Sequence, residues 1–284
     1  MAGFIDDDIV VDLATLPEIS MASPTTTAKT ALITGASSGI GRALAACFAA
    51  DGWNIVLAAR GVAKLETLAA ELAARHGITA TVIGADLSSA EGASALHAEV
   101  ERRGIVVDAL VANAGAGTYG DIRDGDLAKD VAMIQLNTTS VVVLTRLVLA
   151  GLIARRGKIL VTASTAAFQP CPHMAIYAAT KAFVLSFCEA LAEEISDTGV
   201  TVTALCPGPT ATGFFDAAEM NASALVKGKR LPSSESVAAV GYRAMLKGRR
   251  VVVPGLMNNI LVQSVRFTPR RVITRIVSIM ARRV

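Results

Sequence analysis

Two residues with complementary acid–base chemistry stand four positions apart in the second half of the chain. They are the first and last residues of Tyr177-Ala178-Ala179-Thr180-Lys181, and residues at this spacing lie on one face of a helix. A phenol, with a pKa of about 10, is a poor base at neutral pH. A neighbouring ammonium lowers that pKa, so Tyr177 could exchange a proton with a substrate oxygen. The spacing is also common in ordinary amphipathic helices, so the pair alone is not specific.

Two polar residues upstream make the pair more informative. Ser164 follows an apolar segment, 158–162, at the carboxyl end of an expected strand, where open α/β sheets place their ligands. Asn137 lies inside an expected helix, a position that disfavours asparagine and therefore suits a functional role. Ser164 as a hydrolase nucleophile would need a Gly-x-Ser-x-Gly turn, which its context Thr162-Ala163-Ser164-Thr165 lacks.

A glycine-rich turn stands much earlier, in Thr34-Gly35-Ala36-Ser37-Ser38-Gly39-Ile40-Gly41. It joins an expected strand to an expected helix. Glycines there allow a pyrophosphate to approach the backbone, and the helix presents free N–H groups and its positive end to the phosphates. The spacing differs from the Gly-x-Gly-xx-Gly of most dinucleotide folds. We expect cofactor contacts from Gly35, Ser37, Ser38, Gly39, Ile40 and Gly41.

The end of the second expected strand distinguishes the two nicotinamide cofactors. A carboxylate there would bind the ribose 2′-hydroxyl of NAD, whereas a 2′-phosphate requires its absence and a nearby arginine. The strand ends in Ala59-Arg60, and the next acid is Glu66. We therefore expect NADP(H), with Arg60 on the phosphate. Ser38 stands where a second basic residue would strengthen this prediction, which leaves NAD(H) open.

Strands and helices are expected to alternate along most of the chain. Apolar strand patterns occupy residues 31–34, 54–59, 79–85, 107–111, 158–162, 200–205 and 251–253. Helical patterns occupy 39–50, 64–75, 90–103, 129–153 as one or two helices, 177–196 and 233–247. Near-continuous apolar strands separated by amphipathic helices predict an α/β fold. We expect a single doubly wound Rossmann-type domain over residues 30–255, with a parallel sheet covered by helices on both faces.

In this order, the motifs resemble those of the short-chain dehydrogenase/reductase family over about residues 30–215, and most closely its bacterial ketoacyl-reductase-like branch. The resemblance implies that Ser164 hydrogen-bonds the substrate oxygen and that Tyr177 is the acid/base. It implies that Lys181 tunes Tyr177 and holds the nicotinamide ribose, while Asn137 anchors a water of the proton relay. Further cofactor contacts implied by position are Asp86, Leu87, Asn113, Ala114, Gly115, Tyr177, Lys181, Pro207, Gly208, Thr210 and Thr212. Ala112 replaces an asparagine common in the family.

Composition excludes several other functions. The chain of 284 residues is 52% hydrophobic and 18% charged with a net charge of +3, so we expect a large core and no nucleic-acid partner. The four cysteines lack metal-like spacing, so we expect no metal and a cytoplasmic location. Residues 1–29 are expected to form a flexible extension, without the basic and apolar order of a secretory signal. Met21 could also be an alternative start.

The last segment, 256–284, is predicted to be a basic amphipathic tail. No acidic residue follows Glu235. From residue 270, apolar residues recur beside arginines at helical spacing. Such a helix can pack over the active site or against another subunit, which we favour, or lie on a membrane surface.

These motifs predict an NADP-dependent oxidoreductase that interconverts a carbonyl and its alcohol. Apolar residues at 168–174 and at Phe214 and Phe215 favour an apolar ketone or a 3-oxoacyl compound as substrate. A small polar substrate, such as a hydroxy amino acid or a sugar alcohol, is the alternative. A non-catalytic dinucleotide sensor would lack one of the catalytic residues, and all are present. We expect a homo-oligomer, either a dimer or a tetramer.

Overall fold

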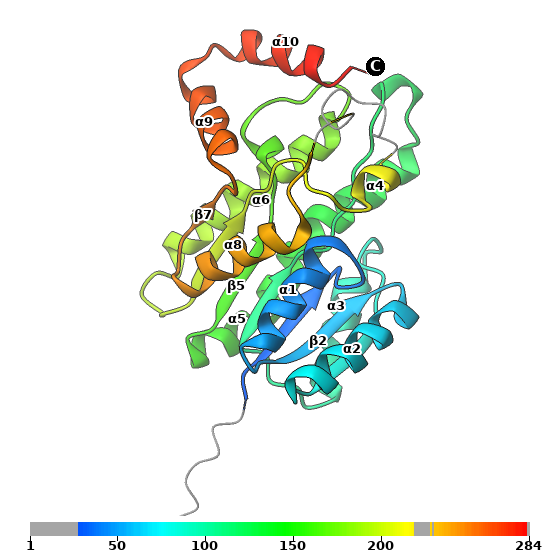
Figure 1. The fold of residues 1–284 in the computed structure, drawn as a ribbon, viewed down its shortest axis with the longest axis vertical. Coiled ribbons are helices and arrows are strands. Elements are labelled where there is room, and N and C mark those ends of the chain that lie inside the picture. The colour runs from blue at the N-terminus through cyan, green and yellow to red at the C-terminus, as the bar shows by residue number, and fades with distance from the viewer. Residues whose placement is uncertain (1–27, 219–227, 229, 283–284) are drawn as a thin grey trace, which may run out of the picture.

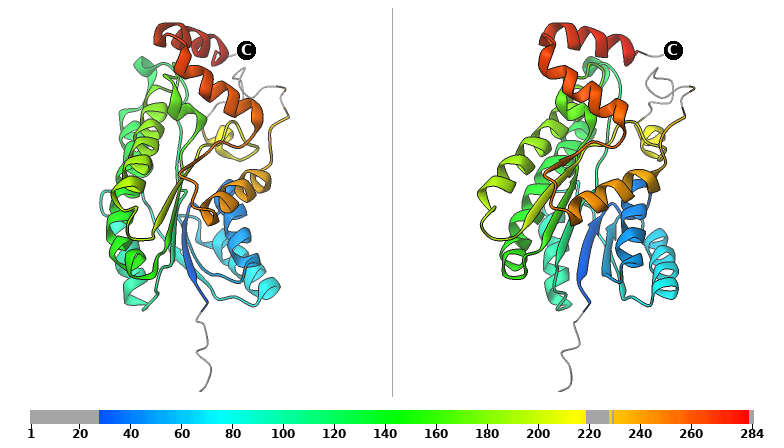
Figure 2. Two further views of the ribbon diagram at one scale, coloured as in Figure 1. Left: turned by 90° about the vertical axis from the view of Figure 1, so that its left-hand side faces the viewer. Right: turned by 60° about the vertical axis from the view of Figure 1, so that its left-hand side comes forward.

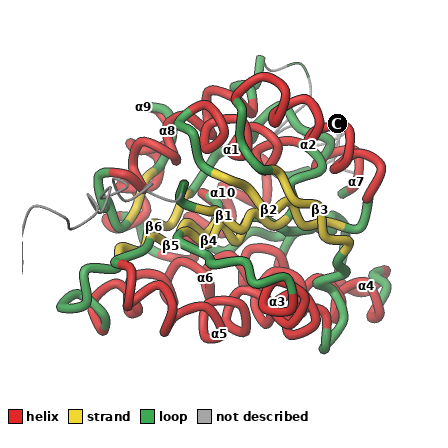
Figure 3. Tube along the Cα trace, turned by 90° about the horizontal axis from the view of Figure 1, so that it is seen from below, coloured by secondary structure: helices red, strands yellow, loops and turns green. Residues whose placement is uncertain are grey.

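A seven-stranded parallel sheet forms the middle of the molecule in the computed structural model, which describes residues 28–218, 228 and 230–282. Its spatial order is β3-β2-β1-β4-β5-β6-β7. The strands are β1 (Thr30–Thr34), β2 (Asn54–Ala59), β3 (Ala80–Gly84), β4 (Ala109–Ala112), β5 (Lys158–Thr162), β6 (Thr201–Leu205) and β7 (Val251–Val252). Figure 3 shows this sheet between two layers of helices. The predicted fold class is confirmed.

The helices divide between the two faces of the sheet. One core cluster joins it to α1 (Gly39–Ala50), α2 (Val62–His76) and α8 (Ser234–Leu246). The other joins it to α3 (Gly92–Arg102), α5 (Ser140–Arg155) and α6 (Ala175–Glu194). The remaining α-helices are α4 (Leu127–Ile134), α7 (Phe214–Ala217), α9 (Leu256–Ser264) and α10 (Arg270–Met280). Figure 1 shows α9 and α10 at the end of the molecule opposite the start of β1.

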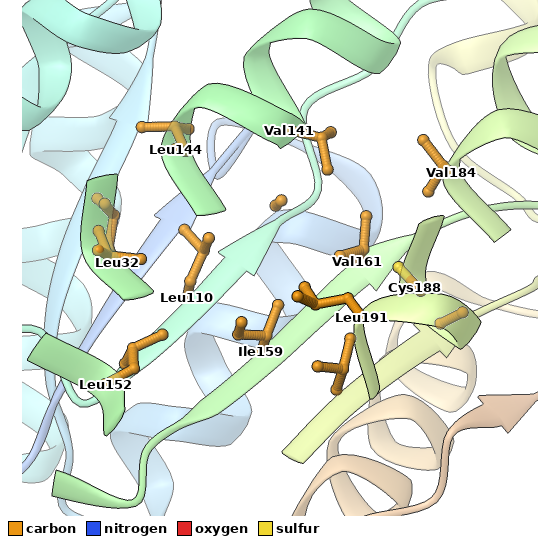
Figure 4. Close-up of a cluster of buried hydrophobic side chains, with 14 of the residues drawn as sticks. Leu32, Leu110, Val141, Leu144, Leu152, Ile159, Val161, Val184, Cys188 and Leu191 are labelled. Atoms are coloured by element: carbon orange, nitrogen blue, oxygen red, sulfur yellow. The ribbon is translucent and has the colours of Figure 1, made fainter. Parts of the chain in front are cut away.

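Aliphatic side chains from neighbouring strands hold the layers together. Leu32, Leu110 and Ile159 occupy successive positions across β1, β4 and β5 and are fully buried. Figure 4 shows Leu32 and Leu110 below Leu144 of α5, and Ile159 beside Leu191 of α6. Because both faces are covered, each strand is apolar at almost every position, which explains why the strands could be predicted from short apolar runs.

A 29-residue helical stretch, Leu127–Arg155, is apolar and long enough to cross a membrane, and so is α6. In the fold both are core helices, since Leu144, Val148 and Leu152 of the first and Val184 and Cys188 of α6 are buried in the cluster against the sheet. The predicted helix at 129–153 is therefore one continuous stretch. A π-helical segment, Gln135–Thr139, lies between α4 and α5 and was not predicted.

The order of the strands determines where a ligand can bind. The chain moves outward from β1 to β3 and then returns to place β4 on the other side of β1. Helices that follow β1 and β4 consequently diverge, leaving a crevice at the carboxyl ends of these strands. The loops after β1, β4, β5 and β6 all reach this edge, and they carry most of the predicted site residues.

Most predicted boundaries lie within two residues of the observed ones, but the C-terminal region differs more. Residues 256–264 form α9, a helix that the tail assignment did not separate from α10. Proline at position 269 precedes α10, as its preference for helix starts predicts. Of the predicted N-terminal extension, residues 1–27 lie outside the described part of the chain.

Candidate active site

A single cavity of about 1560 Å³ extends along the carboxyl edge of the sheet and collects nearly all the predicted site residues. It is a crevice at the strand-order reversal, as expected for open α/β folds. Its lining includes Gly35, Ser37, Ser38, Gly39, Ile40, Arg60, Asp86, Leu87, Asn113, Ala114, Gly115, Ser164, Tyr177, Lys181, Pro207, Gly208, Thr210 and Thr212. Gly41 and Asn137 are not among the lining residues, because both lie behind the cavity wall.

The turn after β1 is shaped by glycines that serve different purposes. Gly35 and Gly39 have φ angles of +65° and +53°, in a region that glycine occupies without the penalty of a Cβ atom. A Cβ atom on Gly41 would lie 2.3 Å from the carbonyl oxygen of Gly35 and 2.4 Å from Nδ2 of Asn113. Gly41 therefore allows α1 to pack directly on the turn and contributes through backbone packing.

The N-terminus of α1 is suited to bind an anion. Its N-cap residue, Ser38, makes no side-chain capping bond, and the first turn holds no acidic residue. The first N–H groups of a helix lack partners within the helix and carry its positive dipole end. Since Ser38, Gly39 and Ile40 line the cavity, these donors fit the pyrophosphate of a dinucleotide.

Asn113 connects three strand ends. Its Nδ2 donates to the carbonyl oxygens of Thr34 and Gly35 at 3.1 and 3.3 Å, and its Oδ1 accepts from the Thr162 hydroxyl at 3.0 Å. The Thr34 hydroxyl oxygen accepts from the backbone N–H groups of Asn113 and Ala114. Asn113 lines the cavity, and its amide also links β1, β4 and β5, a role that the sequence prediction did not include.

The end of the cavity beside Arg60 and Asp86 holds charged groups of both signs. Asp86 accepts hydrogen bonds from the Ser88 hydroxyl at 2.6 Å and the Ser88 backbone N–H at 3.0 Å. These bonds, with a smaller contribution from the charge of Arg60, lower the pKa of the Asp86 carboxyl. Lys64, in the first turn of α2, lines the same region as Arg60. Sequence reasoning missed Lys64 because it considered the strand end and the glycine turn but not the following helix.

Tyr177 and Lys181 lie together on α6 at the wall of the cavity. The Lys181 Nζ donates to the carbonyl oxygen of Thr162 at 2.8 Å and lies 5.9 Å from the centroid of the Tyr177 ring. Phe214 packs beside the phenol, with ring centroids 5.4 Å apart. The backbone of β5 thus positions the ammonium beside the phenol, in the arrangement expected from the four-residue spacing.

Ser164 stands at the start of a short 3₁₀ turn, Thr165–Phe168, where its hydroxyl accepts from the Ala166 N–H at 3.1 Å. Burial raises the pKa of Tyr177 to about 12, and a hydrogen bond with Ser164 opposes this shift. Burial lowers the pKa of Lys181 to about 8. Before any ligand binds, the Tyr177 phenol is therefore neutral at physiological pH, and Lys181 loses its proton more readily than an exposed lysine.

Asn137 lies in the π-helical segment and is buried. Its Oδ1 accepts from the Ala116 N–H at 3.0 Å, while its Nδ2 donates to the Ala116 carbonyl at 2.9 Å and to the Thr180 hydroxyl at 3.0 Å. A π-bulge inside an α-helix is often found at a functional site. Here it allows Asn137 to join the loop after β4 to α6, one residue from Lys181.

The region beside Tyr177 is apolar. Cys171, Met174, Phe214 and Phe215 line it, as the sequence suggested. Phe168 instead packs against the large core cluster, and Pro170 and Pro172 are also not part of the lining. Residues from α9 and α10, among them Leu261, Ile276 and Met280, close the cavity from above. Among the described residues, no group of three or more metal-binding side chains occurs.

Comparison with known proteins identifies this arrangement. Residues 29–222, more than half of the chain, match the family model for short chain dehydrogenases. The chain belongs to the short-chain dehydrogenase/reductase family. It is an NAD(P)-dependent oxidoreductase.

Its relatives include oxidoreductases of different lengths. An uncharacterized oxidoreductase, YmfI of Bacillus subtilis, is 35% identical over 193 residues, which are 66% of this chain and 77% of that protein. The very-long-chain 3-oxoacyl-CoA reductase of Anas platyrhynchos is 35% identical over 189 residues, or 64% of this chain and 60% of that protein. The chain thus matches only about three fifths of the latter enzyme.

Solved structures share the fold. A short-chain dehydrogenase of Sphingobium yanoikuyae in complex with NADPH has a TM-score of 0.74 at 28% identity, covering 86% of this chain and 97% of its own. A family member from Burkholderia phymatum in complex with NAD has a TM-score of 0.73 at 26% identity, covering 83% and 92%. Related proteins therefore bind either cofactor.

The packing of Gly41 yields a stability prediction. Gly41→Ala should lower the free energy of unfolding by about 1–3 kcal/mol, the usual cost of overpacking, and should weaken dinucleotide binding because Asn113 and the turn must shift. Thermal unfolding and a fluorescence titration with NADPH measure the two effects. Gly61→Ala is the control for unfolding, since its added Cβ meets open space at a φ of −83°. Because Gly61 lines the cavity, it is not a control for dinucleotide binding. Equal thermal unfolding of the two variants would contradict the proposed packing.

Proposed function

We propose that this enzyme uses NADP(H) to reduce an apolar ketone or a 3-oxoacyl compound, or oxidises the matching alcohol. The observation that carries the proposal is the continuity of the cavity. It runs from Arg60 and Lys64, past Tyr177, to an apolar compartment under α9 and α10. A dinucleotide would occupy the polar part, which leaves the apolar part to the substrate.

The proposed chemistry uses the four predicted catalytic residues. When bound, the reduced dinucleotide supplies the hydride that adds to the carbonyl carbon. The carbonyl oxygen, hydrogen-bonded by Ser164 and Tyr177, then takes the phenolic proton of Tyr177. Lys181 stabilises the resulting phenolate through its charge, because opposite charges at short range favour the ionised form. Asn137 holds the Ala116 segment against α6 and, by family resemblance, orients a water that returns the proton.

The preference for NADP(H) rests on charge at the adenosine end. β2 ends at Ala59 and Arg60 follows it, so no carboxylate from that position opposes a 2′-phosphate. Arg60 and Lys64 both line this end, and guanidinium groups bind phosphate through paired hydrogen bonds. Asp86 lies nearby, and its carboxylate already accepts two hydrogen bonds from Ser88. Its proposed contact is with the adenine base and not with the 2′-phosphate.

We also propose that the enzyme is cytoplasmic and homo-oligomeric. Cys171, Met174 and Phe214 beside the phenol favour an aliphatic or ring substrate over a hydroxy amino acid or a sugar alcohol, because desolvating polar groups without partners is costly.

A turnover screen tests the reaction and the substrate class. NADPH and NADH are each supplied with aliphatic, steroidal and 3-oxoacyl carbonyls and with small polar ones. We expect the apolar compounds to react fastest with NADPH. Tyr177→Phe should lower kcat by about 100-fold or more, the usual contribution of a general acid, with NADPH binding retained by fluorescence titration. Near-normal turnover in Tyr177→Phe would overturn the mechanism, and a preference for polar carbonyls would overturn the substrate assignment.

The pKa of Lys181 predicts how reduction depends on pH. Lys181 is charged below its pKa of about 8, and only the charged form stabilises the phenolate that reduction produces. The kcat/KM for reduction should therefore be constant at lower pH and fall as the pH rises through about 8. Lys181→Met should show a much lower rate without this decline. A wild-type rate that increases over the same range would contradict the assignment.

Substitutions at the adenosine end test the cofactor preference. Arg60→Ala and Lys64→Ala should each raise the KM for NADPH by about tenfold to 100-fold, the value of a hydrogen bond to a charged group, and should change the KM for NADH little. Arg75→Ala is the control, because this exposed arginine at the other end of α2 is not part of the cavity lining. Equal changes with both cofactors would count against a 2′-phosphate site.

A further inference from the structure

The two C-terminal helices have an inner face that is part of the cavity. Ile273 and Ala281 of this region are buried, and Val277 packs against the cluster that contains Tyr177 and Phe215. The Tyr119 hydroxyl donates to the carbonyl oxygen of Ala281. These contacts confirm that α10 packs over the active site, the arrangement favoured from the sequence. They do not account for the outer face of the helices.

The outer face exposes large apolar side chains. Ile260, Phe267, Val272 and Ile279 are between 46% and 87% exposed, and none of them is part of the cavity lining. Val272 and Ile279 lie about two helical turns apart on α10. Phe267 lies three residues before Arg270, the first residue of α10. Isolated exposed apolar residues are common, but several on one short segment mark an interaction site.

The same face is strongly basic. Residues 256–282 contain no Asp or Glu, and their arginines are Arg266, Arg270, Arg271, Arg275 and Arg282. All five are exposed, and none of them forms an ion pair with a carboxylate in the described part of the chain. On α10, positions 271, 275 and 282 lie beside Ile279 in helical projection. Cationic and apolar residues thus share one helical surface, as in helices that bind the membrane interface.

We infer that the outer face of α9 and α10 docks on an anionic lipid membrane. Ile260, Phe267, Val272 and Ile279 would enter the boundary between headgroups and acyl chains. The arginines would contact lipid phosphates, to which juxtamembrane basic residues are attracted. Figures 1 and 2 show the two helices together at one end of the molecule, so docking need not involve the sheet.

The charge distribution favours a membrane over a second copy of the chain. A symmetric dimer built on this face would place the same arginines of both subunits near one another, and like charges in a shared interface disfavour association. An anionic bilayer satisfies both the apolar and the cationic side chains. Because the chain carries no compensating acid in this segment, the attraction should weaken as salt is added.

Docking also places the cavity next to a source of apolar molecules. The inner faces of the same helices, through Leu261, Ile276 and Met280, line the apolar part of the cavity. A small displacement of α9 and α10 at the membrane would open this part toward the acyl chains. Delivery of an apolar carbonyl in this way rests on the proposed function, whereas the docking itself does not.

Vesicle flotation of the full-length protein tests the docking. We expect binding to phosphatidylcholine vesicles that contain phosphatidylglycerol, weak binding to phosphatidylcholine alone, and release by high salt. Phe267→Gln with Ile279→Gln should lower the partition coefficient at least tenfold. Arg271→Gln with Arg275→Gln should lower it by about fivefold per arginine on anionic vesicles, with little change on neutral ones. Val106→Gln with Arg249→Gln, exposed positions outside the two helices, should bind like the wild type.

Other readouts separate the possible failures. All variants should reduce a water-soluble ketone at the wild-type rate, because none of the substituted side chains lines the cavity. Absence of flotation, or flotation unchanged in both double variants of the helices, would overturn the docking. Loss of self-association on light scattering, without a change in flotation, would assign the face to a second copy instead. Normal flotation with no advantage for a vesicle-borne long-chain ketone would overturn only the delivery of substrate.

Discussion

One asparagine side chain links the three strand ends around which the active site is built. The amide of Asn113 bonds the backbone after β1 and the Thr162 hydroxyl at the end of β5 while its own backbone ends β4. The glycine turn after β1 and the carbonyl that holds Lys181 both belong to this group of strands. Two of the bonds are to the backbone carbonyls of Thr34 and Gly35. Replacing Asn113 would remove the donor to both carbonyls and uncouple the glycine turn from the end of β5.

The acid–base pair lies in the same framework, and its electrostatics follow from burial. Both Tyr177 and Lys181 are largely buried, so the neutral form of each side chain is more strongly favoured than it would be in water. The Thr162 carbonyl that accepts from Lys181 keeps the ammonium in place without neutralising it with a carboxylate. An acidic partner would fix the lysine more tightly but would also cancel the charge that a phenolate needs. The neutral Thr162 carbonyl therefore holds the Lys181 ammonium in position and leaves its positive charge free to stabilise a phenolate.

The sequence was sufficient for the sheet, the glycine turn and the shared helix face of Tyr177 and Lys181, and insufficient for features that depend on contacts between distant elements. Apolar runs such as 158–162 predict strands because both faces of the sheet are covered. The Tyr177–Lys181 spacing predicts a shared helix face because helix geometry is local.

The packing of Gly41 against Asn113, by contrast, has no local signal in the sequence, since 72 residues separate them. Lys64 was missed because the prediction considered the end of β2 and the glycine turn but not the first turn of the helix that follows β2. The α9 helix was missed because some of its apolar residues line the cavity and others are exposed. Its apolar residues therefore do not form the single stripe by which a helix is recognised in a sequence.

The π-helical segment at Gln135–Thr139 has a consequence for the rotational phase of the long helix that contains it. Each residue of an α-helix advances the side-chain direction by about 100°, and a π-turn accommodates one extra residue within the helix. On its two sides, Met133 faces the cluster around Tyr177, and Leu144 and Val148 face the sheet. Without the extra residue, every side chain of α5 would be rotated by more than a quarter turn relative to α4. Asn137 thus lies where the side-chain direction of the long helix shifts, and a deletion of one residue there would change what either α4 or α5 faces.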